Sequence, residues 1–272
     1  MLSAEFQFHA PTSVAAAVAL LAGDADGAKV LAGGMSLMPA MNLGLTRPTS
    51  VVSLNHVTEL DYVEEESGVL RIGAMTRHRR IESDPLIRRF APLLSRAASF
   101  IGDVQIRNRG TIGGSLVHAD PAADYLPVMV ALDATFTLAG SDGRRTVKAR
   151  DFFVDILRTA AGPGEILVEV EVPKLAEGAG SAYLRLARVE GSFAIVNAAA
   201  VAGAGAPVLA VGGATPTPVL VDVPAEVEQV GDAAYEACED AFGDLSAPAE
   251  YRRAMARVYA RRAVEAALQA RT

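Results

Sequence analysis

Two short segments of the sequence place a pair of glycines beside hydroxyl-bearing residues: Ala32-Gly33-Gly34-Met35-Ser36 and Thr111-Ile112-Gly113-Gly114-Ser115. Glycine has no Cβ, so paired glycines leave the backbone N–H groups open and let another group approach closely. After a strand, such a segment can form a concavity that binds an anion such as a diphosphate. Either segment alone could be an ordinary turn between a strand and a helix. Two of the same form favour two walls around one elongated ligand.

The glycine pattern differs from that of a Rossmann domain. Neither segment fits G-x-G-x-x-G, and Gly203-Ala204-Gly205 lacks both the third glycine and a following helix. A dinucleotide-binding Rossmann unit is therefore disfavoured.

Composition limits the classes of protein that remain. The chain has 272 residues, of which 51% are hydrophobic, enough for two domains or for one domain with two lobes. The net charge of −7 argues against nucleic acid as a partner. Residues 1–28 contain no Lys or Arg, and the apolar run 14–22 is shorter than the roughly 20 residues that cross a bilayer. We expect a cytoplasmic protein with no membrane span.

Metal binding by this chain is not expected. Cys238 is the single cysteine, so it can form neither an intrachain disulfide nor a thiolate cluster. The four histidines (His9, His56, His78 and His118) are scattered, and solvated or structural roles are the simpler interpretation. Any metal that the protein works with should lie on another chain.

The residue pattern predicts alternating strands and helices. Strands are expected at 6–8, 29–32, 51–53, 62–74 (two strands), 134–138, 145–148, 165–172, 182–188, 194–201 and 208–211. Helices are expected after the Ser13 N-cap up to residue 23, over 39–45, over 77–100 with breaks at Pro85 and Pro92, and from Asp120-Pro121 to about 132. Residues 102–110 read as a polar connection. A lobe boundary is expected within 173–180.

The last helix is expected to begin at Ala249. Its pattern puts Tyr251, Met255, Val258 and Tyr259 on one face and its arginines, from Arg252 to Arg262, on a solvated face.

The order of these motifs resembles one family. Ala-Gly-Gly-x-Ser near residue 32 is followed by the run 105–115 (QIRNRGTIGGS), by 120–124 (DPAAD), by Glu165-Ile166-Leu167 and by 211–218 (VGGATPTP). This order is similar to that of the FAD-binding medium subunits of the molybdenum hydroxylase family, which includes carbon monoxide dehydrogenase and xanthine dehydrogenase. The likeness spans nearly the whole chain. It implies a mixed α/β (α+β) fold: a two-lobed FAD-binding domain of the vanillyl-alcohol-oxidase/PCMH-like type over 1–176, with lobes of about 1–56 and 57–176, and a smaller α+β domain over 177–272.

The resemblance also implies which residues bind a non-covalent FAD. Residues on one side would be Lys29, Val30, Leu31, Ala32, Gly33, Gly34, Met35, Ser36 and Leu37. Those on the other would be Ile101, Gly110, Thr111, Ile112, Gly113, Gly114 and Ser115, with the diphosphate held by both glycine segments. Asp120, Asp124, Ile166 and Leu167 would complete the nucleotide surroundings, and His118 lies close enough in sequence to border them. Without the resemblance, Asp120 reads as a helix cap and Asp124 as a first-turn acid.

Three positions depart from the family pattern. Arg185 falls where many relatives carry Lys, which keeps the charge but changes the contact geometry. Met35 replaces a commoner His. Phe193 stands where the carbon monoxide enzymes have Tyr near the flavin ring, so ring stacking would persist without a hydroxyl hydrogen bond, although a plain core phenylalanine is the simpler alternative.

The resemblance implies electron transfer, with no catalytic residue and no metal on this chain. FAD would receive electrons from an iron–sulfur small subunit and deliver them to an external acceptor. A molybdopterin large subunit would complete the complex, a dimer of heterotrimers. The alternative is a self-sufficient flavin oxidase or reductase on the same fold, which would need a substrate pocket and a proton donor that the sequence does not reveal.

Overall fold

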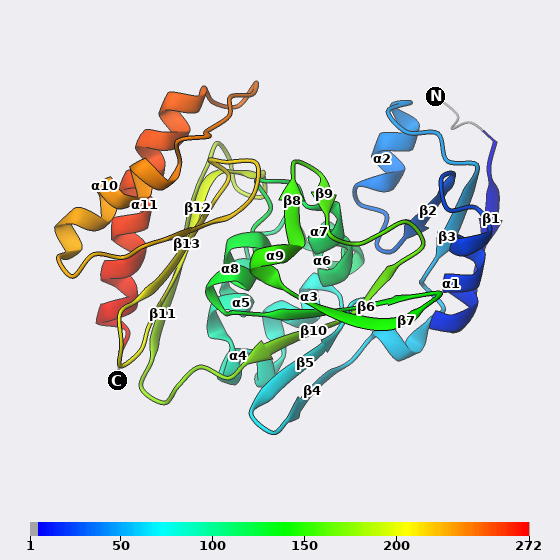
Figure 1. The fold of residues 1–272 in the computed structure, drawn as a ribbon, viewed down its shortest axis with the longest axis horizontal. Helices are drawn as coiled ribbons and strands as arrows, with labels where there is room; N and C mark the ends of the chain where they lie inside the picture. Colours follow the sequence, from blue (N-terminus) through cyan, green and yellow to red (C-terminus); the bar gives the residue numbers. More distant parts are fainter. Residues whose placement is uncertain (1–4, 272) are drawn as a thin grey trace.

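A computed structural model describes residues 5–271 and shows a mixed α/β protein in three parts. Along the longest axis an N-terminal lobe, a central part with most of the helices, and a C-terminal unit follow one another (Figure 1). The two flanking parts each pack against the central part.

The N-terminal lobe is a small parallel sheet in the order β1-β3-β2. Its strands are β1 (Gln7–His9), β2 (Ala28–Leu31) and β3 (Ser50–Ser53), and its helices are α1 (Val14–Gly23) and α2 (Leu37–Asn42). The predicted N-cap of α1 is confirmed, because the Ser13 hydroxyl accepts a hydrogen bond from the N–H of Ala16. Helix α2 begins two residues before Pro39, which is tolerated because it lies in the first turn.

The central part is an antiparallel sheet in the order β4-β5-β10-β6-β7 with helices beside it. The strands are β4 (Val63–Glu66), β5 (Val69–Gly73), β6 (Thr135–Gly140), β7 (Gly143–Lys148) and β10 (Ile166–Pro173). The helices are η1 (Thr58–Leu60), α3 (His78–Ser83), α4 (Pro85–Phe90), α5 (Pro92–Ala98), α6 (Val104–Arg109), α7 (Ile112–His118), α8 (Tyr125–Ala131) and α9 (Ala149–Phe152), followed by the small hairpin β8 (Phe153–Asp155) and β9 (Arg158–Thr159). The predicted breaks at Pro85 and Pro92 are confirmed.

The C-terminal unit is a four-stranded antiparallel sheet covered by two helices. Its elements are β11 (Gly180–Ala187), β12 (Ala194–Ala202), β13 (Val208–Gly212), β14 (Val219–Val221), η2 (Val227–Gln229), α10 (Val230–Ala237) and α11 (Ala249–Gln269). Alanines on α11 and on the strands let the helix lie close to the sheet.

Two expectations about where helices begin are corrected. Residues 104–109 form helix α6, which begins at the Asp103 N-cap, and not a polar connection. Helix α8 begins at Tyr125 and not at Asp120-Pro121, because the carbonyls of Pro121 and Ala122 accept hydrogen bonds from the C-terminal unit instead of from a next helical turn.

The arginines of α11 are not all solvated. Arg252 is 1% exposed, and the buried face of the helix consists of Arg252 and small apolar residues: Ala256, Ala260, Ala263, Val264 and Ala267. Tyr251, predicted on the apolar face, is 43% exposed. The alanines form the apolar face because their small side chains allow the closest approach to β12.

Candidate cofactor site

The two glycine segments meet in the structure. A Cβ built on Gly33 would lie 2.3 Å from the carbonyl oxygen of Arg109 and 2.7 Å from the Cα of Gly110. A Cβ built on Gly114 would lie 3.5 Å from that of Ala32. We call residues 32–36 together with residues 109–115 the glycine junction. Only glycine at position 33 permits this approach of two backbones from separate lobes.

The first segment of the glycine junction offers unused donors. Within residues 5–271, the backbone N–H groups of Gly33, Gly34, Met35 and Ser36 donate to no protein acceptor. Gly34 has a φ of +79°, a conformation that favours glycine. The Ser36 hydroxyl, at the N-cap of α2, makes no capping hydrogen bond. Four consecutive free donors suit an anionic group.

The second segment has a different local structure, although its sequence pattern is the same as that of the first. Residues 112–115 are the first turn of α7, and their N–H groups donate to the protein. The acceptors are the carbonyl of Thr76 for Ile112 (3.0 Å), the carbonyl of Ala74 for Gly113 (2.9 Å), and the hydroxyl and carbonyl of Thr111 for Gly114 and Ser115 (3.1 Å each). Gly113 instead allows close packing, because its Cβ would lie 2.7 Å from the Ala74 carbonyl oxygen. The expectation of two equivalent anion-binding loops is therefore corrected.

A polar bridge that the sequence did not reveal holds the glycine junction together. Asn55, just after β3, donates from Nδ2 to the Ala32 carbonyl at 3.2 Å and accepts at Oδ1 from Arg77 at 2.9 Å. Arg77 also donates to the Arg109 carbonyl. The bridge thus ties Ala32 of the first segment to Arg109 of the second. A single polar residue after a strand gave no pattern by which to find it.

A second group of predicted residues meets at the boundary between the central part and the C-terminal unit. The Arg185 guanidinium lies 3.1 Å from Asp124 Oδ1, and the side chains of both residues are 6% exposed. Tyr183 donates its hydroxyl to the same carboxylate oxygen at 2.6 Å. Burial raises the pKa of Asp124 to about 6, against the opposing effects of Arg185 and Tyr183. The Asp124 carboxylate thus has partners within the protein.

Arg185 also holds the backbone next to Ile101 and Phe193, two other residues predicted to line the cofactor site. It donates to the carbonyl of Phe100, which precedes Ile101, at 2.9 Å and to the carbonyl of Ser192, which precedes Phe193. Phe193 is 58% exposed, so it is not a core phenylalanine. Ile101 is half-buried.

A histidine connects the two groups. The His78 backbone N–H donates to the Gly110 carbonyl at 3.0 Å, and its Nδ1 lies 3.1 Å from the hydroxyl of Tyr125, the residue after Asp124. Burial, followed by Arg77 and Arg107, lowers the pKa of His78 to about 3, so the ring is neutral. Of the two roles expected for this histidine, solvated or structural, its burial supports the structural one.

The remaining predicted residues are less closely grouped. Lys29, Val30 and Leu31 lie in β2, with Lys29 exposed, and Leu37 begins α2. Ile166 and Leu167 are each 3% exposed in β10, within the protein core. His118 ends α7. Asp120 does not cap a helix: its Oδ1 accepts from the N–H of Ala122 at 2.9 Å in a local turn.

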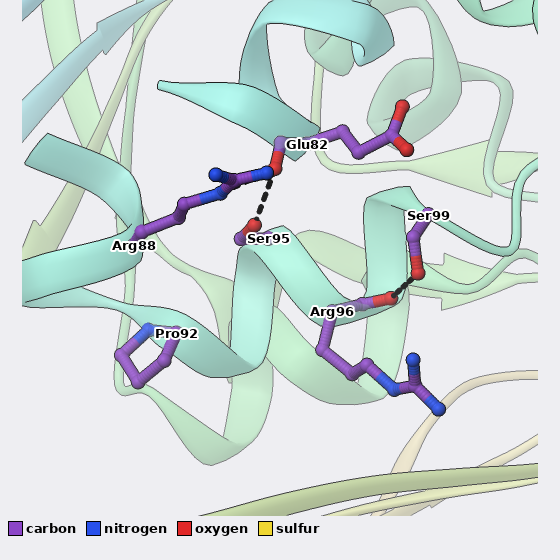
Figure 2. Close-up of a pocket in the computed structure, with 6 residues that line it drawn as sticks. All are labelled: Glu82, Arg88, Pro92, Ser95, Arg96 and Ser99. Carbon is purple, nitrogen blue, oxygen red and sulfur yellow. Dashed lines mark hydrogen bonds between the residues drawn. The ribbon is translucent and has the colours of Figure 1, made fainter. Parts of the chain in front are cut away.

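A shallow cavity lies elsewhere. Its volume is about 340 Å³, and it lies between α3 and α5, where Figure 2 shows its lining of Glu82, Arg88, Pro92, Ser95, Arg96 and Ser99. Ser95 donates to the Glu82 carbonyl and Ser99 to the Arg96 carbonyl, both at 2.7 Å. None of the predicted cofactor residues lines this cavity.

No helix within residues 5–271 combines the length and the apolar character needed to span a membrane. The same residues contain no group of three or more His, Cys, Asp or Glu arranged to hold a metal ion. Cys238 is buried, which raises the pKa of its thiol to about 11.

Comparison with known proteins gives the class of the chain. Residues 4–175 match the family described as the FAD binding domain in molybdopterin dehydrogenase, and the chain belongs to this family. It is an oxidoreductase subunit whose cofactor is FAD.

Individual relatives extend the likeness to the full length. The chain is 38% identical to the carbon monoxide dehydrogenase medium chain of Hydrogenophaga pseudoflava, over 98% of each chain. The structure of that organism's carbon monoxide dehydrogenase lacking the Mo-pyranopterin moiety matches with a TM-score of 0.96 over 100% of both chains. A subunit of the 6-hydroxypseudooxynicotine dehydrogenase complex of Paenarthrobacter nicotinovorans is 41% identical over 72% of this chain and 66% of its own. The predicted family and the mixed α/β fold are confirmed.

Proposed function

We propose that the chain binds FAD without a covalent bond at the glycine junction and carries electrons from the iron–sulfur clusters of a partner chain to an external acceptor. The observation that carries this proposal is the set of four free N–H donors beside the Gly33–Gly110 contact. A diphosphate is the part of FAD that fits such a donor set, since oriented backbone N–H groups bind anions. No carboxylate contacts these donors within the described part of the chain.

The protein's own residues would divide the binding between them. Gly33 to Ser36 would donate to the diphosphate, while Gly110 to Ser115 would form the opposite wall, with the Ser115 side chain as a donor. Asn55 and Arg77 would hold the two walls at their observed spacing. Ile101, Arg185 and Phe193 would surround the flavin end. Asp124, Ile166 and Leu167 would support that end from within the protein.

The chemistry comes from the cofactor. When bound, FAD supplies the exchange of electrons, and the protein supplies position, electrostatics and access. Arg185 contributes a buried positive charge whose hydrogen bonds fix its orientation.

The wider assembly follows from the family of medium subunits. We propose an iron–sulfur small subunit and a molybdopterin large subunit as partners, in a cytoplasmic dimer of heterotrimers. We also propose a division of this chain into a FAD-binding domain over 1–176, with lobes of about 1–56 and 57–176, and a C-terminal domain over 177–272. The separate sheets β4-β5-β10-β6-β7 and β11-β12-β13-β14 support that division.

The test combines cofactor binding with partner identity. The tagged full chain is purified from its native host, and its visible spectrum and its accompanying chains are recorded. We expect a flavin spectrum, release of intact FAD on denaturation, and two further chains that carry iron, sulfur and molybdenum.

Two outcomes would overturn the proposal. A chain that stays free of flavin after incubation with FAD would remove the cofactor assignment. Purification without any companion chain, together with steady oxidation of an organic substrate by the chain alone, would favour a self-sufficient flavin enzyme.

A further inference from the structure

Four consecutive residues, Pro121 to Asp124, are each hydrogen-bonded by the C-terminal unit. The contacts are Gly213 N–H to the Pro121 carbonyl (2.9 Å), Ala194 N–H to the Ala122 carbonyl (3.4 Å), Asn197 Nδ2 to the Ala123 carbonyl (3.3 Å), and the Tyr183 hydroxyl to Asp124 (2.6 Å). We call residues 121–124 the docking segment. Its polar groups are used for holding two parts of the protein together, which explains why the segment is not helical.

The last of these contacts extends to the flavin end of the proposed site. Arg185, paired with Asp124, also binds the carbonyls of Phe100 and Ser192. Gly191 packs against the same region, since its Cβ would lie 3.1 Å from the carbonyl oxygen of Gly102. One buried guanidinium therefore holds the segment 100–102 and the loop 189–193 against each other.

These contacts are mutually dependent. Within the described residues, Asp124 is the one carboxylate that pairs with the Arg185 guanidinium. The Arg185 Nε is buried there without a hydrogen-bond partner. Tyr183 fixes the carboxylate through a short hydrogen bond. Removing one partner from a buried charged group leaves the others uncompensated. Removing the hydrogen bond between Tyr183 and Asp124, or the ion pair between Asp124 and Arg185, should therefore release the loop 189–193, which carries Phe193.

We infer that Asp124, Tyr183 and Arg185 form a positioning device that locks the loop 189–193 onto residues 100–102 and thereby sets the flavin's environment. The effect on the flavin rests on the proposed function, whereas the lock itself is a property of the protein without cofactor. Asp124 acts in this device through Arg185. The choice between Lys and Arg at position 185 then matters because a guanidinium spreads five donors over a planar fork that reaches three separate acceptors, whereas an ammonium carries its three donors on one atom.

The test compares two tyrosine variants of the full chain. Tyr183→Phe removes the hydroxyl at the docking segment, and Tyr235→Phe removes a matched hydroxyl that bonds Glu250 within the C-terminal unit at 3.0 Å. Amide hydrogen exchange is measured by mass spectrometry without cofactor. The emission and the reduction potential of the flavin are then measured after FAD is added.

We expect Tyr183→Phe to speed exchange of the 189–195 amides by roughly tenfold to hundredfold, the factor for losing a hydrogen bond to a charged acceptor. With Tyr183→Phe, exchange in α11 should not change, whereas the flavin's emission and potential should shift. Tyr235→Phe should leave exchange of the 189–195 amides and the flavin's emission and potential unchanged. Arg185→Lys, which keeps the charge but loses the three-way contact, should give an intermediate effect.

Unchanged exchange over 189–195 in Tyr183→Phe would overturn the inference, as would a uniform increase across the whole C-terminal unit. If the wild-type chain binds no FAD, the proposed function fails, and the exchange comparison still decides whether the lock exists. If FAD binds and the loop loosens but the flavin's emission and potential stay constant, the claim about the flavin's environment is wrong.

Discussion

Gly33 lies against the backbone of Gly110, so closely that a Cβ at position 33 would meet the Gly110 Cα at 2.7 Å and the Arg109 carbonyl oxygen at 2.3 Å. These residues belong to different lobes, and each is followed by part of the proposed FAD site. Because the contact is between two backbones, it fixes the spacing of the two walls. Rearranged side chains could not make room for a Cβ at position 33. A methyl group at position 33 must push the walls apart.

We therefore predict that Gly33→Ala destabilises the chain by about 1–3 kcal/mol, the usual cost of overpacking. FAD affinity should fall more than roughly tenfold, because the donors no longer converge on the diphosphate. Denaturant unfolding and fluorescence titration measure the two effects. Gly203→Ala is the control, since a Cβ at position 203 meets nothing within 4 Å. Normal FAD binding by Gly33→Ala would contradict the assignment of the site.

Gly34 tests the orientation of the donors separately from their spacing. Its φ is +79°, and that of Gly68, in a turn far from the site, is +81°. Alanine at either position should cost about 1 kcal/mol in stability through the same backbone strain. Only Gly34→Ala should also weaken FAD binding, because relieving the strain turns the neighbouring N–H groups. Equal FAD affinity in the two variants would show that these N–H groups do not bind the cofactor.

The sequence predicted much of the fold because many signals were local. The Ser13 cap and the prolines that begin α4 and α5 each act within a few residues. The pairing of the two glycine segments was also foreseen. Their different uses were not, because the acceptors that engage residues 112–115 include carbonyls at Ala74 and Thr76, which no local pattern connects to α7.

Other features depended on distant parts of the chain. The sequence Asp120-Pro121 is typical of a helix N-terminus. The carbonyls of the docking segment, however, accept hydrogen bonds from β12 and from the turn after β13. Asn55 gave no signal at all. Charged residues on a terminal helix normally face solvent, and nothing near Arg252 in sequence indicates which buried carbonyls it reaches.

His78 predicts acid sensitivity. Because burial lowers its pKa to about 3 from an ordinary value near 6.5, the unfolded chain binds the proton more readily than the folded chain between these values. Its contribution to stability is full above pH 6.5 and is lost as the pH falls, with a slope of at most about 1.4 kcal/mol per pH unit. We expect His78→Asn to be less stable at pH 7 but to show a shallower loss between pH 6.5 and 4. Parallel unfolding curves for variant and wild type over that range would contradict this.

The raised pKa of Asp124 predicts the opposite pH dependence, in which stability falls as the pH rises. Its pKa is raised to about 6 from 3.8, so the folded chain binds the proton more readily, and its contribution is full below pH 3.8 and is lost as the pH rises through 6. Asp124→Asn should remove this fall. The variant's stability relative to wild type should therefore improve as the pH rises from 4 to 6. Urea unfolding at several pH values measures the difference, and a relative stability that declines over this range would show that Arg185 outweighs burial.

Arg252 anchors the C-terminal helix to the sheet beneath it. Its Nη1 donates to the carbonyls of Ile195 and Gly213 at 2.6 Å each, and its Nη2 lies 2.7 Å from Asp244. Arg252→Met keeps most of the volume but leaves buried carbonyls without donors, so we expect a loss of about 2–5 kcal/mol in unfolding free energy.

The matched control for Arg252→Met is Arg261→Met on the same helix. The Arg261 side chain is 48% exposed and, within residues 5–271, pairs with Glu265 alone, at 3.5 Å. That change should cost less than about 0.5 kcal/mol, because exposed ion pairs contribute little. Denaturant unfolding followed by circular dichroism compares the two variants. Since Gly213 also donates to the Pro121 carbonyl, Arg252→Met should in addition speed amide exchange at Gly213, which Arg261→Met should not. Equal losses of stability would mean that the buried guanidinium contributes no more than a surface one, and that packing of the alanines alone holds α11 in place.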